Sequence, residues 1–275
     1  MPELPEVESV LRQLAPRLTD RAITAVEATP QARFRDLEAL VGRRVAGLRR
    51  RGKYLIARLE PDAELVAHLG MTGSFRFRGE PWLGDGGGVW QPDAYVRATL
   101  WLDDGALLDF RDVRRFGRLA VVAPGDYSAI PTLAGLGPEP LSDAFDPDRF
   151  HRDLAKSRMP VKPQLLSQRP VAGVGNIYAD EALWLARISP FARGLGRVRA
   201  RRLWEAIRQV LSDAVEREGT SFRDYLMVNG QAGRNAAFLA VYGQHERPCP
   251  RCGGPLSKVV LGGRGTTFCR RCQRR

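Results

Sequence analysis

The first residues of the chain combine an amine with two carboxylates, a set that could do covalent chemistry. The chain opens MPELPEVESV. Methionine aminopeptidases remove Met1 when a small residue follows, which would leave Pro2 as a free secondary amine. An α-amine titrates at about pH 8, far below a lysine, so more of it is neutral and nucleophilic. Glu3 adjoins this amine and could exchange protons with it, and Glu6 follows one helical turn later. Taken alone, these residues also fit an ordinary helix start.

Lysines are scarce, so a catalytic lysine is easy to shortlist. Of the 43 Lys and Arg residues only four are lysines: Lys53, Lys156, Lys162 and Lys258. Lys53 stands at the turn of RRGKYL, directly after three arginines and a glycine. This setting fits either a lysine placed for catalysis or a solvated basic hairpin.

Four cysteines form two C-x2-C pairs near the end of the chain. The pairs are Cys249 with Cys252 and Cys269 with Cys272, and 16 residues separate them. In a reducing compartment this spacing is typical of a tetrahedral zinc site with four thiolate ligands. Two disulfides are the alternative, and a cytosolic location disfavours them. We therefore predict one structural zinc ion.

The composition indicates a soluble protein with a polyanionic partner. The chain has 275 residues and a formal net charge of +12. Such a charge favours nucleic-acid binding, because arginines that neutralise phosphates release condensed counterions. No apolar run approaches the length of about 20 residues that a membrane span needs. The acidic start lacks the apolar region of a secretory signal, so we expect a cytoplasmic protein.

The first half of the chain predicts one helix followed by many short strands. Apolar residues recur at helical spacing in residues 2–18, with Pro5 in the first turn. From about residue 22 to 122 the pattern changes to short β-type runs, and Asp104–Gly105 is a hairpin signal. This half predicts an antiparallel β-sandwich. Residues 79–93, rich in glycine, predict a loop.

The second half predicts helices and then a zinc hairpin. We expect helices over 148–157, 176–188 and 199–218, the last ending at Gly219. The expected class is α+β: an N-terminal helix on an antiparallel β-sandwich, a helical helix–two-turn–helix domain and a C-terminal β-hairpin zinc finger. The expected boundaries are 1–125 for the sandwich, 126–147 for a linker, 148–240 for the helical domain and 241–275 for the zinc finger.

Four motifs, taken together, resemble the formamidopyrimidine-DNA glycosylase family, whose relatives include endonuclease VIII-like enzymes. They are MPELPEVESV, RRGKYL, PVAGVGNIYADEALW and GGRGTTFCRRC, which puts Arg264 in the zinc hairpin. The resemblance covers the whole chain in the same order. It implies a monomeric base-excision-repair enzyme that removes oxidised purines, such as 8-oxoguanine and formamidopyrimidines, from duplex DNA. It also implies cleavage of the strand at the abasic site.

The resemblance implies roles for the candidate catalytic residues. The Pro2 amine would attack sugar C1′ and form an iminium ion, which makes the C2′ protons acidic enough for β,δ-elimination. Glu3 would protonate the opening sugar, and Glu6 would orient that end of the helix. Lys53 would reach the sugar and phosphate at the lesion. Arg264 would hold the lesion phosphates and assist the second elimination.

The resemblance also assigns DNA contacts. A base leaves the stack before it is cut, and an apolar or aromatic wedge can fill the gap. Met71, Arg114 and Phe116 are assigned to the gap, with Arg114 facing the orphaned base. The residues expected at phosphates are His68, Arg97, Arg115, Lys156, Lys162, Asn176 and Tyr242.

Two positions depart from the family pattern. Gln164 stands where an aromatic residue is common, and Arg234 and Asn235 stand where an aromatic often follows the second glycine. The second departure adjoins the expected lesion-capping loop, roughly 219–230, so lesion preference stays open. Two other functions also stay open: excision of oxidised pyrimidines in the manner of endonuclease VIII, and DNA binding by a zinc-containing protein without catalysis.

Overall fold

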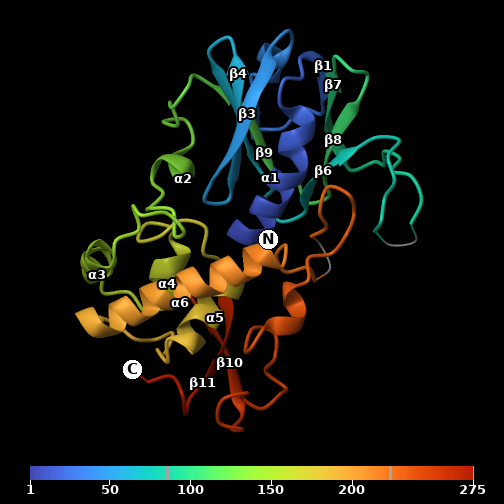
Figure 1. Cartoon of the computed structure of the whole chain (residues 1–275). Helices are drawn as coiled ribbons and strands as arrows, with labels where there is room; N and C mark the ends of the chain where they lie inside the picture. Colours follow the sequence, from blue (N-terminus) through green and yellow to red (C-terminus); the bar gives the residue numbers. More distant parts are fainter. Residues whose placement is uncertain (85–86, 223–224, 275) are drawn as a thin grey trace. The chain divides into compact units, whose positions relative to one another are not determined.

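The computed structural model describes residues 1–84, 87–222 and 225–274 (Figure 1). They form two compact units. The first unit contains Met1–Ala134 and Arg217–Arg234, and the second contains Gly135–Glu216 and the residues from Asn235 onward. The expected loops 79–93 and 219–230 each include two residues, 85–86 and 223–224, that lie outside the described set. Among the described residues, no helix is long and apolar enough to cross a membrane.

Helix α1 (Leu4–Leu18) begins the first unit, as its apolar spacing predicts. Glu3 is the N-cap, and the side chains of Glu3 and Glu6 each accept the other residue's backbone N–H in a capping box. Pro5 lies in the first turn, where its missing N–H breaks no helical hydrogen bond. The apolar face, which includes Val7, Val10, Leu14 and Leu18, is buried in the core.

Two sheets form the sandwich of the first unit. One has the order β1-β7-β8-β6 and is antiparallel throughout. The other has the order β2-β9-β5-β4-β3 and is antiparallel except for the two-residue pairing of β2 with β9. The sandwich is antiparallel as expected, apart from this short pairing at one edge. The strands are β1 (Ile23–Ala28), β2 (Phe34–Arg35), β3 (Arg44–Arg51), β4 (Tyr54–Glu60), β5 (Ala63–His68), β6 (Gly73–Phe77), β7 (Val96–Leu102), β8 (Leu107–Asp112) and β9 (Arg118–Val122).

The core of this unit lies where α1 and the two sheets meet (Figure 1). Leu14 of α1, Leu55 of β4 and Phe110 of β8 are buried in one cluster. Each such side chain contributes about 1.5–3 kcal/mol by leaving water. The expected hairpin at Asp104–Gly105 joins β7 to β8, and Gly105 has a φ of +85°. Short elements complete the unit: η1 (Leu37–Leu40) and α2 (Pro131–Ala134).

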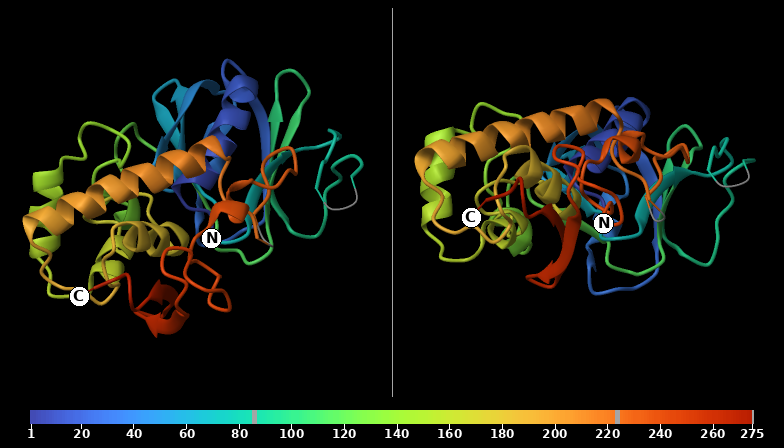
Figure 2. Two further views of the ribbon diagram at one scale, coloured as in Figure 1. Left: turned by 60° about the horizontal axis from the view of Figure 1, so that its bottom comes forward. Right: turned by 90° about the horizontal axis from the view of Figure 1, so that it is seen from below.

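Helix α6 (Arg197–Glu216) is the longest element of the second unit and packs along α3 (Pro147–Ala155) and α5 (Asn176–Leu185) (Figure 2). A short helix, α4 (Val161–Leu166), was not expected from the sequence. Pro160 is its N-cap and Pro163 lies in its first turn, so prolines obscure a real helix start. The hairpin of β10 (Leu256–Leu261) and β11 (Arg264–Cys269) follows η2 (Asn235–Phe238).

The segment 217–234 belongs to the first unit, whereas the sequence placed it in the helical domain. Tyr225, Met227 and Val228 are buried in the sandwich core. The backbone N–H of Thr220 also donates to the Glu6 carboxylate at 2.7 Å. The chain therefore returns to the first unit after α6 and completes the core built by the first 134 residues. The order of residues alone could not predict this, because the segment follows α6 directly.

Candidate active site and nucleic-acid interface

One end of the five-stranded sheet gathers the functional turns of the first unit. Arg51 pairs with Tyr54, Tyr54 with His68, and His68 with Arg118, so these residues form one row across β3, β4, β5 and β9. The turn that carries Lys53 begins at this row. The segments that carry Met71 and Phe116 also adjoin it. The register of the sheet thus brings together residues that lie far apart in the sequence.

Glu6 fixes the start of helix α1. Its carboxylate accepts the Glu3 N–H at 2.7 Å and the Thr220 N–H at 2.7 Å, one on each oxygen, and the residue is 1% exposed. A side chain at Gly219, where φ is +81°, would come within 2.8 Å of the Glu6 carboxylate. Because both oxygens of Glu6 bind backbone donors, the carboxylate fixes the Glu3 backbone next to the buried Pro2.

Lys53 lies in the two-residue turn between β3 and β4 and is 7% exposed. Gly52 begins that turn with a φ of +57°, which a glycine adopts at no steric cost. Arg50 donates to the Glu8 carboxylate of α1 at 2.9 Å and to the Gly52 carbonyl at 3.1 Å. This bridge fastens the Lys53 turn to the first half of helix α1.

His68 is held neutral beside this turn. Burial, reinforced by the positive charges of Lys53, Arg118 and Arg33, lowers the pKa of His68 to about 4. Its Nδ1 accepts the backbone N–H of Gly70 at 3.0 Å, so the neutral ring carries its proton on Nε2. The Tyr54 ring packs against it at 4.6 Å between centroids. His68 can therefore offer one N–H donor to an anion without carrying a charge.

Two segments that link the sheets carry the expected gap-filling residues. Met71 lies between β5 and β6, and Arg114 and Phe116 lie between β8 and β9. A side chain at Gly70 would come within 2.5 Å of the Phe116 backbone, so the two segments touch there. Phe116 is 40% exposed, and the Arg114 guanidinium lies 4.9 Å from its ring centroid. The structure therefore brings the three residues into one surface region.

Asp112 holds these two segments together, and the sequence analysis missed it. One of its oxygens accepts the Thr72 hydroxyl at 2.5 Å, and the other accepts the Gly117 N–H at 2.7 Å. The Thr72 oxygen accepts the Arg114 N–H at 3.0 Å. A buried aspartate at the end of a strand gives no signal by itself, because its partners lie on another segment.

Arg97 and Arg115 differ in their placement. Arg115 is exposed and has a left-handed φ of +56°. Arg97 is 8% exposed, and its guanidinium donates to the carbonyls of Asp112 and Ala94 at 2.9 and 3.1 Å. The expectation of a phosphate contact at Arg97 does not fit this burial. Arg97 instead supports the Asp112 segment from inside the sheet.

In the second unit, Lys162 belongs to a buried ion pair and does not lie at the surface. It is 0% exposed, and its ammonium lies 2.7 Å from the Asp180 carboxylate. It also donates to the Gly265 carbonyl at 3.0 Å and the Thr266 hydroxyl at 2.9 Å. The prediction that Lys162 contacts phosphate is therefore wrong, because three protein oxygens surround its ammonium group. Burial raises the pKa of Asp180 to about 6 although Lys162 opposes the shift.

Asn176 and Arg264 both adjoin Gly265, whose carbonyl also accepts a hydrogen bond from Lys162. Asn176 begins α5 behind the N-cap Gly175, and its amide donates to the Gly265 carbonyl at 3.0 Å. Arg264 is exposed at the start of β11, directly after the turn of Gly262 and Gly263. Helix N-termini and exposed arginines both attract anions. Asn176 and Arg264 can therefore serve one phosphate-binding region.

Glu181 positions the segment that ends at Tyr242. Its buried carboxylate accepts three backbone N–H groups, from Ala240, Val241 and Tyr242, at 2.7 to 2.9 Å. Burial raises the pKa of Glu181 although these donors oppose the shift. Two adjacent acidic residues of YADEALW thus hold different segments. Asp180 binds the β10–β11 hairpin, and Glu181 binds residues 240–242.

Lys156 lies at the surface and Gln164 fixes the chain beside it. The Lys156 side chain is 76% exposed and pairs with Asp153 at 2.6 Å. The buried Gln164 amide donates to the carbonyls of Ser157 and Met159 at 3.3 and 2.6 Å. Gln164, which stands where the family often has an aromatic residue, therefore binds the neighbouring backbone through hydrogen bonds. Lys156 remains available to a phosphate.

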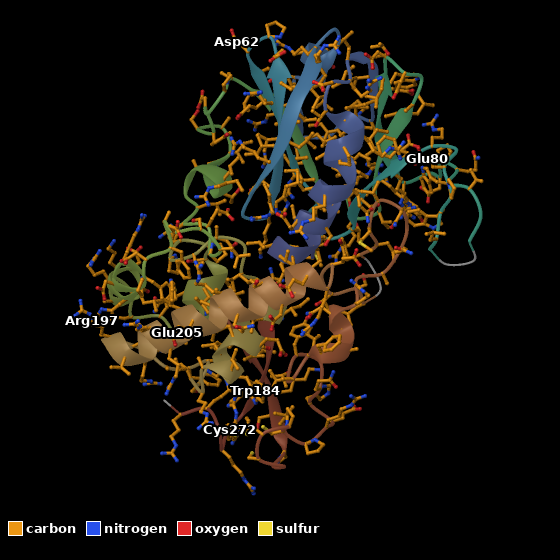
Figure 3. All side chains as sticks on the ribbon, viewed as in Figure 1. Asp62, Glu80, Trp184, Arg197, Glu205 and Cys272 are labelled. Atoms are coloured by element: carbon orange, nitrogen blue, oxygen red, sulfur yellow. The ribbon has the colours of Figure 1, made fainter. Side chains whose placement is uncertain are left out.

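The four cysteines converge at the base of the β10–β11 hairpin. Their sulfur atoms all lie within 4.8 Å of one another, with Cys249 and Cys272 3.9 Å apart and Cys252 and Cys269 3.6 Å apart. Four thiolates at about 2.3 Å from a tetrahedral zinc ion would lie about 3.8 Å apart, so the cluster fits zinc and not disulfides. The Trp184 indole donates to the Cys249 sulfur at 3.4 Å, and Figure 3 shows Trp184 and Cys272 in the same region.

Three family descriptions match successive parts of the chain. The formamidopyrimidine-DNA glycosylase N-terminal domain matches residues 1–119, the H2TH domain of the same family matches 136–225, and a zinc finger found in FPG and IleRS matches 247–275. The chain belongs to the formamidopyrimidine-DNA glycosylase family. The α+β fold and the structural zinc ion expected from the sequence are thereby confirmed.

Relatives within this family match nearly the whole chain. The formamidopyrimidine-DNA glycosylase of Thermus thermophilus is 48% identical over 99% of this chain and 98% of its own length. That of Deinococcus radiodurans is 46% identical over 99% and 97%. The crystal structure of the MutM (FPG) protein from Thermus thermophilus gives a TM-score of 0.90 at 47% identity, covering 99% of this chain and 98% of that one.

Solved complexes with DNA are similar as well. A Lactococcus lactis FPG mutant in complex with a Fapy-dG containing DNA gives a TM-score of 0.88 at 36% identity, with both chains covered completely. A structure of MutM in complex with carbocyclic 8-oxo-G containing DNA gives a TM-score of 0.88 at 35% identity, again with complete coverage of both chains. The similarity extends across both units of the formamidopyrimidine-DNA glycosylase fold.

Proposed function

We propose that this DNA glycosylase excises oxidised purines from duplex DNA with the N-terminal amine of Pro2 as its nucleophile. The observation that carries the proposal is the start of helix α1, where Glu6 fixes Glu3 and the preceding Pro2 at the end of the sandwich that also holds Lys53. Family membership supports the reaction, and the relatives solved with Fapy-dG and 8-oxo-G DNA support the substrate class.

The first step is attack of the Pro2 nitrogen on sugar C1′. A bond forms between that nitrogen and C1′ while the bond from C1′ to the base breaks; the base leaves with the electron pair and gains a proton as the amine loses one. Glu3 then protonates the ring oxygen O4′, the bond from C1′ to O4′ breaks, and the nitrogen lone pair completes an iminium ion. Glu6 is a poor acid for this step because both of its oxygens accept backbone N–H groups. Lys53 assists at the sugar and its phosphate.

Strand cleavage at the abasic site follows from the same intermediate, and the protein thereby acts as an AP lyase. The iminium ion withdraws electrons, so a C2′ proton is lost and the 3′ phosphate leaves by β-elimination. A second, δ-elimination releases the 5′ phosphate. Arg264 is exposed and can hold the departing phosphate with two parallel hydrogen bonds.

Met71, Arg114 and Phe116 fill the place of the extruded base. An aromatic ring and an apolar side chain can replace lost stacking. The Arg114 fork has donors and no acceptor, which suits the acceptor edge of an orphaned cytosine. Phosphates of the duplex contact His68, Arg115, Lys156, Asn176, Tyr242 and Arg264.

We expect the protein to act as a monomer in the cytoplasm. The zinc cluster supports this compartment, because cysteines that bind metal rather than form disulfides are typical of a reducing environment.

Trapping with borohydride tests the nucleophile. Reduction of the reaction with 8-oxoguanine duplex should leave a covalent adduct that peptide mapping places on the first residue of a chain without Met1. A permanent N-terminal tag should abolish base excision and leave DNA binding largely intact. Pro2→Gly keeps a primary amine, so it should keep some cleavage at abasic sites and lose most excision.

The control is Pro5→Ala, which changes a proline in the first turn of the same helix and leaves the amine untouched. Its excision should stay near that of the wild type. An adduct on Lys53, or full excision by a protein with a blocked N-terminus, would overturn the assignment of Pro2.

A further inference from the structure

Six arginines surround an open hollow of about 670 Å³ in the second unit. Arg187 follows helix α5, and Arg199 and Arg202 lie near the start of helix α6. Arg251, Arg271 and Arg274 come from the zinc finger and the residues after it. Cys272 is the remaining lining residue, so no carboxylate lines the hollow among the described residues.

Among the described residues, no acidic group balances the charge of this arginine hollow. Within the described part of the chain, no carboxylate lies within 4.0 Å of any of the six guanidinium groups. Neighbouring arginines of the same helix behave differently, since Arg197 pairs with Asp148 at 2.9 Å and Arg201 with Glu205 at 3.5 Å. Burial and the adjacent charge of Arg202 lower the pKa of Arg199, as like charges crowded together do. An anion in the hollow would relieve this repulsion.

Two of the six arginine side chains, Arg199 and Arg251, are half-buried and held by the protein, and the other four are exposed. The Arg251 guanidinium donates to the Trp184 carbonyl at 2.9 Å and lies 4.1 Å from the Trp184 ring centroid. Arg199 donates to the Arg274 carbonyl at 2.9 Å, which ties the end of the chain to α6. Cys272 is a zinc ligand, so the metal fixes the chain next to Arg271. These two preorganised donors lose little entropy when they bind an anion, and the exposed arginines around them add positive charge.

The arginine hollow lies at the opposite end of the unit from the phosphate-binding region of Asn176 and Arg264. Asn176 begins α5, whereas Arg187 lies beyond its last residue, and ten helical residues span about 15 Å. Arg264 begins β11, whereas Arg271 follows its last residue, and six strand residues span about 20 Å. A phosphate bound in the hollow is therefore not one that Arg264 holds.

We propose that the arginine hollow binds the phosphate backbone of a second DNA segment while the first segment is bound at Arg264. The proposal rests on the proposed function only in taking DNA as the partner. Arginine forks match phosphate oxygens bidentately, and duplex DNA presents one negative charge per about 1.7 Å of its axis. Once one segment is bound, neighbouring segments of the same DNA are at high effective concentration. An acidic protein is the other class of anion that such a site could take.

Two short duplexes with different fluorophores test this site. The first carries 8-oxoguanine and saturates the lesion site, and the second is undamaged. Energy transfer between them should report a ternary complex with the wild-type protein at low salt. The triple variant Arg187→Gln, Arg202→Gln, Arg271→Gln should lose that complex and still cleave the first duplex at the wild-type rate.

The matched control removes three charges that are already paired. Arg149→Gln, Arg197→Gln, Arg201→Gln lowers the net charge equally, but these arginines pair with Asp153, Asp148 and Glu205. This control should keep the ternary complex. The salt dependence of binding the second duplex should be steep, with a slope of about −3 if three phosphates are neutralised.

Arginine modification gives a readout without any substitution. Phenylglyoxal labelling and mass mapping should show Arg187, Arg202 and Arg271 protected by the second equivalent of duplex and not by the first. The proposal would be overturned if the second equivalent of duplex protected none of these three arginines. It would also be overturned if the triple variant bound the second duplex like the wild type. Binding of poly-glutamate in the hollow with no binding of a second duplex would overturn it as well, and would assign the site to an acidic protein. Failure of lesion cleavage by the wild type would instead reject the proposed function.

Discussion

Two hairpins of this protein each present one basic residue next to a tight turn, and they rest on different foundations. The β3–β4 hairpin carries Lys53 after Gly52, and the β10–β11 hairpin carries Arg264 after Gly262 and Gly263. Gly52 and Gly262 have nearly the same left-handed φ, +57° and +58°. The local device is therefore the same in both units.

The support behind the two turns differs in kind. The β3–β4 hairpin belongs to a five-stranded sheet, and Leu55, Ile56 and Leu59 of β4 are at most 3% exposed. The β10–β11 hairpin is a sheet of its own, and an isolated two-stranded hairpin is marginally stable in water. A zinc cluster and the buried Lys162–Asp180 pair supply what an apolar core supplies for Lys53. The apolar core behind Lys53 and the zinc cluster with its ion pair behind Arg264 can therefore be disrupted independently of each other.

Loss of the zinc ion should produce the largest difference in stability between the two hairpins. Structural zinc contributes about 10–16 kcal/mol of folding free energy to small zinc domains, so Cys252→Ser should disorder the β10–β11 hairpin and Arg264. DNA affinity should collapse, while hydrogen exchange in the β3–β4 hairpin stays as slow as in the wild type. DNA binding that survives in a metal-free protein would show that Arg264 does not depend on the metal.

Breaking the buried ion pair should give the next largest effect. Asp180→Asn leaves Lys162 as a buried charge without its carboxylate, which costs about 3–5 kcal/mol. Hydrogen exchange at the Thr267 amide, which donates to Asp180 at 2.9 Å, should accelerate accordingly. The double variant Lys162→Met, Asp180→Leu removes both charges and should be more stable than Asp180→Asn. If Asp180→Asn matched the wild type, the pair would not be what supports the hairpin.

The end of the sandwich that carries Lys53 should lose stability in acid through His68. The unfolded chain takes up a proton at about pH 6.5, whereas the folded protein holds the pKa of His68 at about 4. Between these values the unfolded state binds more protons, so stability falls as the pH falls, by at most about 1.4 kcal/mol per pH unit. Hydrogen exchange of the paired strands β4 and β5 should follow this dependence. In His68→Gln the dependence across that window should flatten, and an unchanged slope would assign it to another group.

Substitution of the turn glycines should give the smallest effects. A side chain in the left-handed region costs about 1–2 kcal/mol, so Gly52→Ala and Gly262→Ala should each destabilise their own hairpin by that amount. Gly262→Ala should weaken DNA binding more, because its Cβ would also approach Pro163 of α4 at 3.3 Å and the hairpin has little other support. Gly265→Ala is the control, since φ there is not left-handed and a Cβ meets no atom within 4 Å. Equal losses at Gly262 and Gly265, measured by thermal unfolding and DNA titration, would rule out backbone strain as the cause.

The sequence by itself determined the elements whose causes are local. The apolar spacing of residues 2–18 and the proline at position 5 predict helix α1, and the capping box of Glu3 and Glu6 is encoded within four residues. Two C-x2-C pairs predict the zinc cluster, because tetrahedral ligation needs only the four thiolates and a turn between the members of each pair. Asp104–Gly105 predicts its hairpin for the same reason.

Only the tertiary structure decided the roles of residues whose partners are distant in the chain. Lys162 and Arg97 were expected at phosphates, and both are buried, where Lys162 pairs with Asp180 and Arg97 donates to carbonyls. Asp112 and Glu181 gave no signal, and each holds a segment that comes from elsewhere in its unit. The sequence does not distinguish a charged residue that faces water from one that faces a buried partner. The difference lies in desolvation, which only the packing of the folded chain fixes.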